Sequence, residues 1–213
     1  MSEAAERRAV PFGDSEYWVE RYEREAEDGF EWYPGAESIV CEELSHLTSE
    51  ERGWRWLEIG SGSSALASKL AGEHSSATLC VSDVAPNVVA TMKERLLQGG
   101  AQNLEFAVLD ATSMKCIRSE SMDLVFDKGT LDAIDCLDHE HAGTSRCLSE
   151  VRRVLNPGGS YLLVSCREPE GRRRDFELGG LRLVKTVEIK GVDPRCPCPD
   201  AYLFLVQKAE TVP

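Results

Sequence analysis

A chain of 213 residues, 42% of them hydrophobic, can bury one sizeable core without dividing into two independent domains. Its net charge of −13 argues against a nucleic-acid partner, and an acidic surface either attracts a basic protein or serves only solubility. No apolar run is long enough to cross a bilayer, and eight irregularly spaced cysteines with no secretory signal predict reduced thiols and a cytoplasmic protein. The oligomeric state is left open.

Apolar runs alternate with segments of helical periodicity, and this alternation predicts an α/β fold with a doubly wound parallel sheet. The expected helices span residues 15–27, 36–47, 64–72, 86–98 and 142–155. The expected strands span residues 54–59, 77–82, 103–109, 122–127, 159–166, 181–189 and 201–208. The polar stretch 167–180 is expected to be a mobile loop.

The first expected strand runs into the turn Glu58–Gly62, whose sequence is Glu-Ile-Gly-Ser-Gly. The two glycines let the backbone turn tightly and approach a ligand, while the next helix points its first amides into the same crevice. With Ala65, the pattern Gly-x-Gly-x-x-Ala also satisfies the dinucleotide fingerprint, so a nicotinamide oxidoreductase is one alternative. Asp83, roughly 20 residues past the glycines, could accept both ribose hydroxyls of either cofactor.

Two further acids favour S-adenosylmethionine over a dinucleotide. Glu58 places a negative charge where a dinucleotide carries its pyrophosphate, which suits a cofactor without phosphate and with a cationic amino-acid end. The third expected strand ends at Asp110-Ala111, where a side-chain acceptor could meet the exocyclic amine of an adenine.

The ordered motifs Glu58–Gly62, Asp83, Asp110-Ala111 and Asn156–Gly159 resemble those of class I S-adenosylmethionine-dependent methyltransferases. Within that superfamily, the string Asp127–Ala133 and the aromatic residues upstream are similar to the methyltransferase-like group containing the elongation factor 1-alpha lysine methyltransferases. The similarity extends from about residue 16 to residue 165.

This resemblance implies a single-domain, Rossmann-like sheet of seven strands with the last strand antiparallel. Residues 1–50 would form a helical lid segment and residues 51–213 the methyltransferase domain, as one structural unit. The cofactor would be S-adenosyl-L-methionine, with S-adenosyl-L-homocysteine as its product. The residues expected to bind it are Trp18, Tyr22, Trp32, Glu58, Gly60, Ser61, Gly62, Asp83, Val84, Asp110, Ala111 and Lys128.

Trp18 and Tyr22 lie four residues apart and therefore share one face of the first helix. Spacing alone favours packing in the core, whereas the resemblance favours a lid that offers aromatic faces to the sulfonium, with Trp32 beside it. Tyr33 is a further candidate for the same wall.

Methyl transfer to a lysine requires a neutral amine, whose unperturbed pKa is about 10.4. Asp127, at the end of the fourth expected strand, is the first candidate for orienting that amine, and Asp132 is the second. Alternatively, Asp127 binds the cofactor's amino group or caps the following turn. Lys128 is expected to serve the cofactor site or the structure rather than to act as a base.

The fourth strand lacks the Asn/Asp-Pro-Pro-aromatic string of enzymes that methylate base amines or glutamine amides. A protein lysine in a substrate with a basic surface is therefore the first expectation, with a translation elongation factor as one candidate. A small-molecule acceptor and a non-catalytic, cofactor-binding regulatory module are the alternatives. Cys136, His139, His141 and Cys147 lack the paired Cys-x-x-Cys spacing of a zinc site. Cys196-Pro-Cys198 could be a redox or metal pair, but the prolines around it favour a rigid loop, and no metal is expected.

Overall fold

The computed structural model describes residues 10–24, 31–48, 53–136, 141–190 and 200–208. The strands are β1 (Arg55–Ile59), β2 (Thr78–Asp83), β3 (Leu104–Val108), β4 (Met122–Lys128), β5 (Leu155–Ser165), β6 (Leu181–Ile189) and β7 (Ala201–Lys208). The helices are α1 (Ser15–Arg24), α2 (Ala36–Leu47), α3 (Leu66–Glu73), α4 (Pro86–Gln98), α5 (Thr130–Asp135), α6 (Ala142–Val154) and α7 (Pro169–Leu178).

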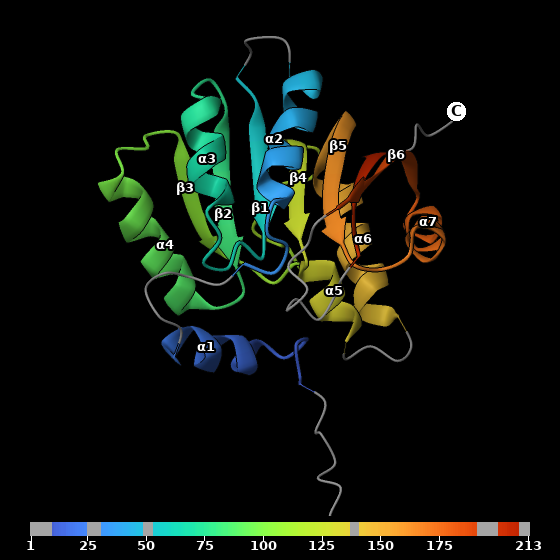
Figure 1. Ribbon diagram of the computed structural model, residues 1–213, viewed down its shortest axis with the longest axis horizontal. Coiled ribbons are helices and arrows are strands. Elements are labelled where there is room, and N and C mark those ends of the chain that lie inside the picture. The colour runs from blue at the N-terminus through green and yellow to red at the C-terminus, as the bar shows by residue number, and fades with distance from the viewer. Residues whose placement is uncertain (1–9, 25–30, 49–52, 137–140, 191–199, 209–213) are drawn as a thin grey trace, which may run out of the picture.

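The seven strands form one sheet in the order β3-β2-β1-β4-β5-β7-β6 (Figure 1). The first five of these run parallel to one another, and β7 runs antiparallel to both β5 and β6. The expected doubly wound sheet with an antiparallel last strand is thus confirmed. Among the described residues, no helix is both long and apolar enough to traverse a lipid bilayer.

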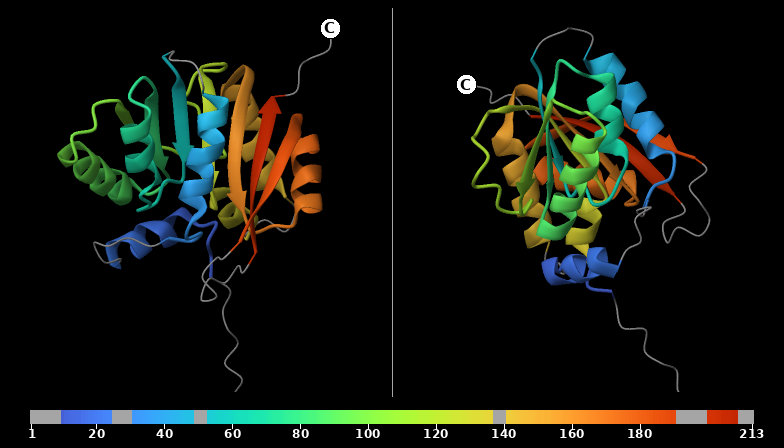
Figure 2. Two further views of the ribbon diagram at one scale, coloured as in Figure 1. Left: turned by 45° about the horizontal axis from the view of Figure 1, so that its top comes forward. Right: turned by 90° about the vertical axis from the view of Figure 1, so that its left-hand side faces the viewer.

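Helices cover both faces of the sheet (Figure 2). Successive side chains of a strand point to opposite faces. Trp56 of β1 and Phe126 of β4 join the core beneath α2, α3 and α4, whereas Leu57 and Val125 join the core beneath α5, α6 and α7. Helix α2, inside the segment expected to be a lid, therefore contributes to the core of the sheet.

Helix α1 lies at the edge of the sheet where the parallel strands end, next to α4 (Figure 1). None of its residues is fully buried, but Trp18, Val19 and Tyr22 pack from one side of the helix against the core. A further anchor is the side-chain amide of Asn87 on α4, which donates to the carbonyl of Val19 at 2.9 Å. The helix is expected to extend to residue 27, and residues 25–27 lie outside the described part of the chain.

The expectation of a mobile loop at 167–180 is wrong, because residues 169–178 form α7. Pro169 occupies the first turn, where its missing N–H costs nothing. Arg172 and Phe176, four residues apart, are both completely buried on the inner face. Because the buried residue Arg172 is charged, the apolar periodicity typical of a helix is absent from this segment of the sequence. The short helix α5 was also not expected.

Replacing Phe176 with Ala tests whether α7 is an integral part of the core. Its ring packs edge-on against Tyr161 and Phe204, with ring centroids 6.4 Å and 5.7 Å apart. We expect Phe176→Ala to lower the free energy of unfolding by about 3–5 kcal/mol in urea denaturation. Leu178→Ala, on the same helix but 85% exposed, should change it by less than about 0.5 kcal/mol. Equal effects of the two changes would contradict the packing of α7.

Candidate functional site

A cavity of about 830 Å³ opens at the carboxyl edge of the parallel strands, beneath α1. Its size is in the range of small-molecule sites. Twelve of the fourteen residues predicted for the site line it: Trp18, Tyr22, Trp32, Gly60, Ser61, Gly62, Asp83, Val84, Asp110, Ala111, Lys128 and Asp132. Glu58 and Asp127 are not among the described residues that line it.

The glycine turn after β1 is tightly constrained by its neighbours. Gly60 has φ +60°, and a Cβ there would lie only 2.0 Å from Oγ1 of Thr130. That hydroxyl donates to the carbonyl of Ile59 at 3.0 Å, so α5 closes directly onto the turn. Gly62 has φ +53°, and its Cβ would meet the hydroxyl of Tyr22 at 2.9 Å. Glycine is therefore required for both backbone conformation and close approach.

Asp83 at the end of β2 is buried and holds the two loops beside it. Its Oδ2 accepts the N–H of Gly62 and its Oδ1 accepts that of Ala85, both at 2.9 Å. Burial raises the pKa of Asp83, although these backbone donors oppose the rise. A carboxylate accepts about four hydrogen bonds, so acceptor sites remain for a ligand. Asp110, at the next strand end, binds the N–H and hydroxyl of Thr112 at 2.8 Å.

An aromatic wall closes the cavity on the α1 side. Trp18 stacks on Tyr22 with ring centroids 5.7 Å apart and meets Trp32 edge-on at 6.2 Å. Phe12, which was not predicted, packs edge-on against Trp32 at 5.4 Å and accepts the indole N–H of Trp18 at its carbonyl. The guanidinium of Arg21 lies 5.1 Å from the Trp32 ring centroid. The wall is thus both apolar and able to attract a cation.

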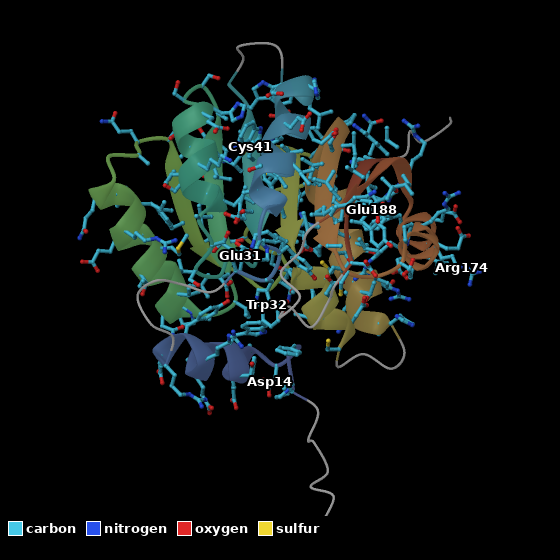
Figure 3. The ribbon with its side chains drawn as sticks, in the orientation of Figure 1. Asp14, Glu31, Trp32, Cys41, Arg174 and Glu188 are labelled. Carbon is cyan, nitrogen blue, oxygen red and sulfur yellow. The ribbon has the colours of Figure 1, made fainter. Side chains whose placement is uncertain are left out.

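Charged groups lie on the side of the aromatic wall that faces the sheet. Figure 3 shows Glu31 and Trp32 between α1 and the sheet. Lys128 donates to Oε1 of Glu31 at 2.6 Å. Glu58 is buried on the same face of the sheet, and its Oε2 has no hydrogen-bond partner among the described residues. Burial raises its pKa to about 7, since the attraction of Lys128 is partly cancelled by Asp83 and Glu31. The charge of Lys128 is thus balanced by Glu31, while Arg21, Arg146 and Arg167 also line the cavity.

Asp127 and Asp132, the two candidates for orienting a substrate amine, both accept hydrogen bonds from other groups of the chain. Asp127 lies under α5, where it accepts the N–H groups of Thr130 and Leu131 and the hydroxyl of Tyr161. These contacts favour the alternative that Asp127 caps the following turn, and its role in orienting an amine stays a prediction. Burial raises its pKa to about 7.

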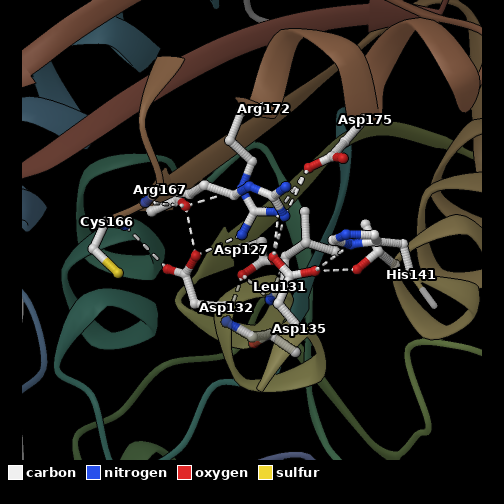
Figure 4. Close-up of polar contacts among 12 residues, drawn as sticks. Asp127, Leu131, Asp132, Asp135, His141, Cys166, Arg167, Arg172 and Asp175 are labelled. Atoms are coloured by element: carbon white, nitrogen blue, oxygen red, sulfur yellow. Dashed lines mark hydrogen bonds and ion pairs between the residues drawn. The ribbon is translucent and has the colours of Figure 1, made fainter. Parts of the chain in front are cut away.

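Asp132 lies at the cavity wall in the polar network that Figure 4 shows. The completely buried Arg172 donates to it at 2.5 Å and also pairs with Asp135 at 2.7 Å and Asp175 at 3.1 Å. Burial works against the charge of Arg172, yet the surrounding carboxylates raise its pKa above the usual value. Arg172 was missed because it lies in the segment expected to be a loop.

The comparisons with known proteins are consistent with this geometry. A family model described as "Methyltransferase domain" matches residues 50–192. The chain belongs to this family. The match begins just before β1 and includes the glycine turn, the strand ends and the fourth strand that bound the cavity.

Several curated relatives are at least 30% identical. The "eEF1A lysine and N-terminal methyltransferase" of Mus musculus is 33% identical over 160 residues, which are 72% of this chain and 22% of that protein. "EEF1A lysine methyltransferase 4" of Mus musculus is 31% identical, over 76% of this chain and 64% of that protein. The mitochondrial citrate synthase-lysine N-methyltransferase of Danio rerio is 30% identical, over 67% and 61%. The chain spans about a fifth of the length of the first relative.

Solved structures share the fold at lower identity. An S-adenosylmethionine-dependent methyltransferase from Methanosarcina mazei superimposes with a TM-score of 0.63 at 16% identity, covering 79% of this chain and 98% of that one. A protein from work on conversion of a disulfide bond into a thioacetal group in echinomycin biosynthesis gives 0.71 at 17% identity, covering 92% and 93%.

The buried carboxyl of Glu58 predicts a pH dependence of stability. Because its pKa in the folded chain is raised to about 7 from an ordinary 4.5, folding favours the protonated form. The contribution of Glu58 to the free energy of unfolding is fully present below about pH 4.5, where the carboxyl is protonated in both states. It is lost as the pH rises to about 7, because the carboxyl ionises first in the unfolded chain. Glu58→Gln, which stays neutral, should therefore gain about 1–3 kcal/mol relative to the unaltered chain between pH 4.5 and 8, measured by urea denaturation. The exposed Glu105→Gln is the control, and a parallel trend in both would contradict the assignment.

Proposed function

We propose that this chain transfers a methyl group from S-adenosylmethionine to the amine of a protein lysine. The observation that carries the cofactor assignment is that one cavity gathers the glycine turn and the acids at the ends of β2 and β3. Asp83, Asp110 and Ala111 all line this cavity, and we assign Asp83 to the ribose and Asp110 with Ala111 to the adenine. This is the order of motifs that the family resemblance implies.

The cavity suits a cofactor that is cationic and carries no phosphate. A Cβ at Gly60 or Gly62 would clash with Thr130 or Tyr22, so the chain's own packing requires glycine at both positions, and both line the cavity. The Oε2 of Glu58 beneath the turn has no partner among the described residues, and because the pKa of Glu58 is raised to about 7 the carboxyl is only partly ionised at neutral pH. Its ionised form would repel a pyrophosphate and favour an ammonium group. Lys128 is already bound to Glu31. These features weigh against the nicotinamide alternative.

The lysine acceptor is proposed from the relatives. The names of several relatives specify protein lysine as the acceptor, on eEF1A in two of them and on citrate synthase in a third. The net charge of −13 favours a basic protein as the substrate. A cytoplasmic location belongs to the same proposal, supported by the six described cysteines, which are all free thiols.

When bound, S-adenosylmethionine supplies an activated methyl group on a positively charged sulfur. The chain's own task is to hold that group and the amine in line and to exclude water, which accounts for most of the acceleration in such a displacement. Trp18, Tyr22 and Trp32 would cover the site and offer their ring faces to positive charge. Asp83 would fix the ribose and thereby the position of the methyl carbon.

Asp83→Asn tests the cofactor assignment. The change keeps the side-chain size but removes the charge, so the ribose hydroxyls lose a charged acceptor. We expect S-adenosylhomocysteine to bind about 1–3 kcal/mol more weakly in calorimetric titration. Asp123→Asn is a matched control, since Asp123 also accepts a strand N–H, that of Arg55, but lies outside the cavity lining. Equal losses in both variants would point to misfolding rather than to a ribose contact.

Incubation with methyl-labelled S-adenosylmethionine and a methyl-depleted cell extract tests the proposed reaction. We expect label in a protein band that maps to a lysine. Label confined to small molecules would replace the protein substrate with a small-molecule acceptor. Binding of S-adenosylhomocysteine without any label would support the non-catalytic regulatory module instead.

A further inference from the structure

Asp132 has no acceptor site left for a substrate. Its Oδ1 accepts the hydroxyl of Ser165 at 2.6 Å and the guanidinium of Arg172 at 2.5 Å. Its Oδ2 accepts the hydroxyl of Tyr33 at 2.7 Å and the N–H of Cys166 at 3.2 Å. A carboxylate accepts about four hydrogen bonds, so these four donors saturate it. The second candidate acid for orienting the amine is thereby fully occupied.

The Tyr33 hydroxyl, by contrast, keeps an acceptor to offer. A phenol has one proton, and the proton of Tyr33 is committed to Asp132. The oxygen has two lone pairs, and the adjacent thiol of Cys166, with its single proton, can occupy only one of them. Tyr33 is only 3% exposed but lines the cavity.

Tyr33 also lies at the end of the cavity where a substrate amine would be needed. Its ring lies against Gly129, directly after β4, where a Cβ would be 3.0 Å from Cε2. The family resemblance implies that the transferred methyl group would lie near the carboxyl end of β4, which is where Gly129 and the Tyr33 ring meet. Burial and the adjacent carboxylate of Asp132 raise the pKa of Tyr33 far above its ordinary value, so the group is a neutral acceptor and not a phenolate base.

We propose that the hydroxyl of Tyr33 accepts a hydrogen bond from the attacking substrate amine and aims its lone pair at the methyl carbon. Asp132 and Arg172 are positioning residues, because they fix which way the Tyr33 proton points. In the step itself, the amine nitrogen forms a bond to the methyl carbon, the carbon–sulfur bond breaks and its electron pair stays on sulfur. The new ammonium then releases a proton to solvent. This inference rests on the proposed function.

Tyr33→Phe removes the hydroxyl and keeps the ring against Gly129. The probe is sinefungin, a cofactor analogue with an amine in place of the sulfonium methyl, compared with S-adenosylhomocysteine, which has no group there. We expect Tyr33→Phe to weaken sinefungin binding about tenfold in calorimetric titration, with S-adenosylhomocysteine changed less than about twofold. Methyl transfer to protein lysine should fall by at least about tenfold.

Tyr161→Phe is the matched control. Tyr161 is equally buried and donates to a carboxylate, that of Asp127 at 2.8 Å, but lies outside the cavity lining. Tyr161→Phe should leave the ratio of the sinefungin and S-adenosylhomocysteine affinities unchanged. Thermal melting of both variants measures how much stability each loses with its buried hydroxyl. An unchanged ratio in Tyr33→Phe, or equal weakening of both ligands, would overturn the role of Tyr33 while leaving the proposed function intact. If the unaltered chain binds neither ligand, the proposed function fails and the role of Tyr33 with it.

Discussion

The parallel arrangement of β1 to β4 is the constraint on which the site depends. Parallel strands end at the same edge of a sheet, so groups far apart in sequence meet there. The turn after β1, Asp83 after β2 and Asp110 after β3 come together in this way, and Lys128 ends β4 beside them. Helix α1 lies at this edge (Figure 1), and its Trp18 and Tyr22 form the aromatic wall together with Phe12 and Trp32.

Side-chain alternation within β4 then divides the charges between two environments. Phe126 and Lys128 point to the face where Glu58 is buried, and Lys128 reaches Glu31. Val125 and Asp127 point to the opposite face, where Tyr161 and the first turn of α5 satisfy the Asp127 carboxylate. One strand therefore contributes both to the cavity lining, through Lys128, and to the packing of α5, through Asp127. The two acids nearest the expected methyl position are held by internal partners.

Much of this could be predicted from sequence because it follows from local patterns. The glycine spacing, the acids at strand ends and the periodic apolar positions of α6 are all short-range signals, and the observed sheet agrees with them. The occupation of Asp132 could not be predicted, because its partners Tyr33, Ser165 and Arg172 are 99, 33 and 40 positions away. The alternation of side chains along β4 assigns Asp127 to the face that α5 covers. Sequence analysis did not place it there because the short helix α5 was not expected.

The central claim is that this edge binds an adenosine carrying a cationic amino-acid end and no phosphate. Parallel calorimetric titrations of the purified chain with S-adenosylhomocysteine and with NAD⁺ test it most directly. The account predicts one molecule of S-adenosylhomocysteine bound per chain and no measurable heat with NAD⁺. Binding of NAD⁺ in preference would contradict it, because a pyrophosphate would then lie over the buried Glu58.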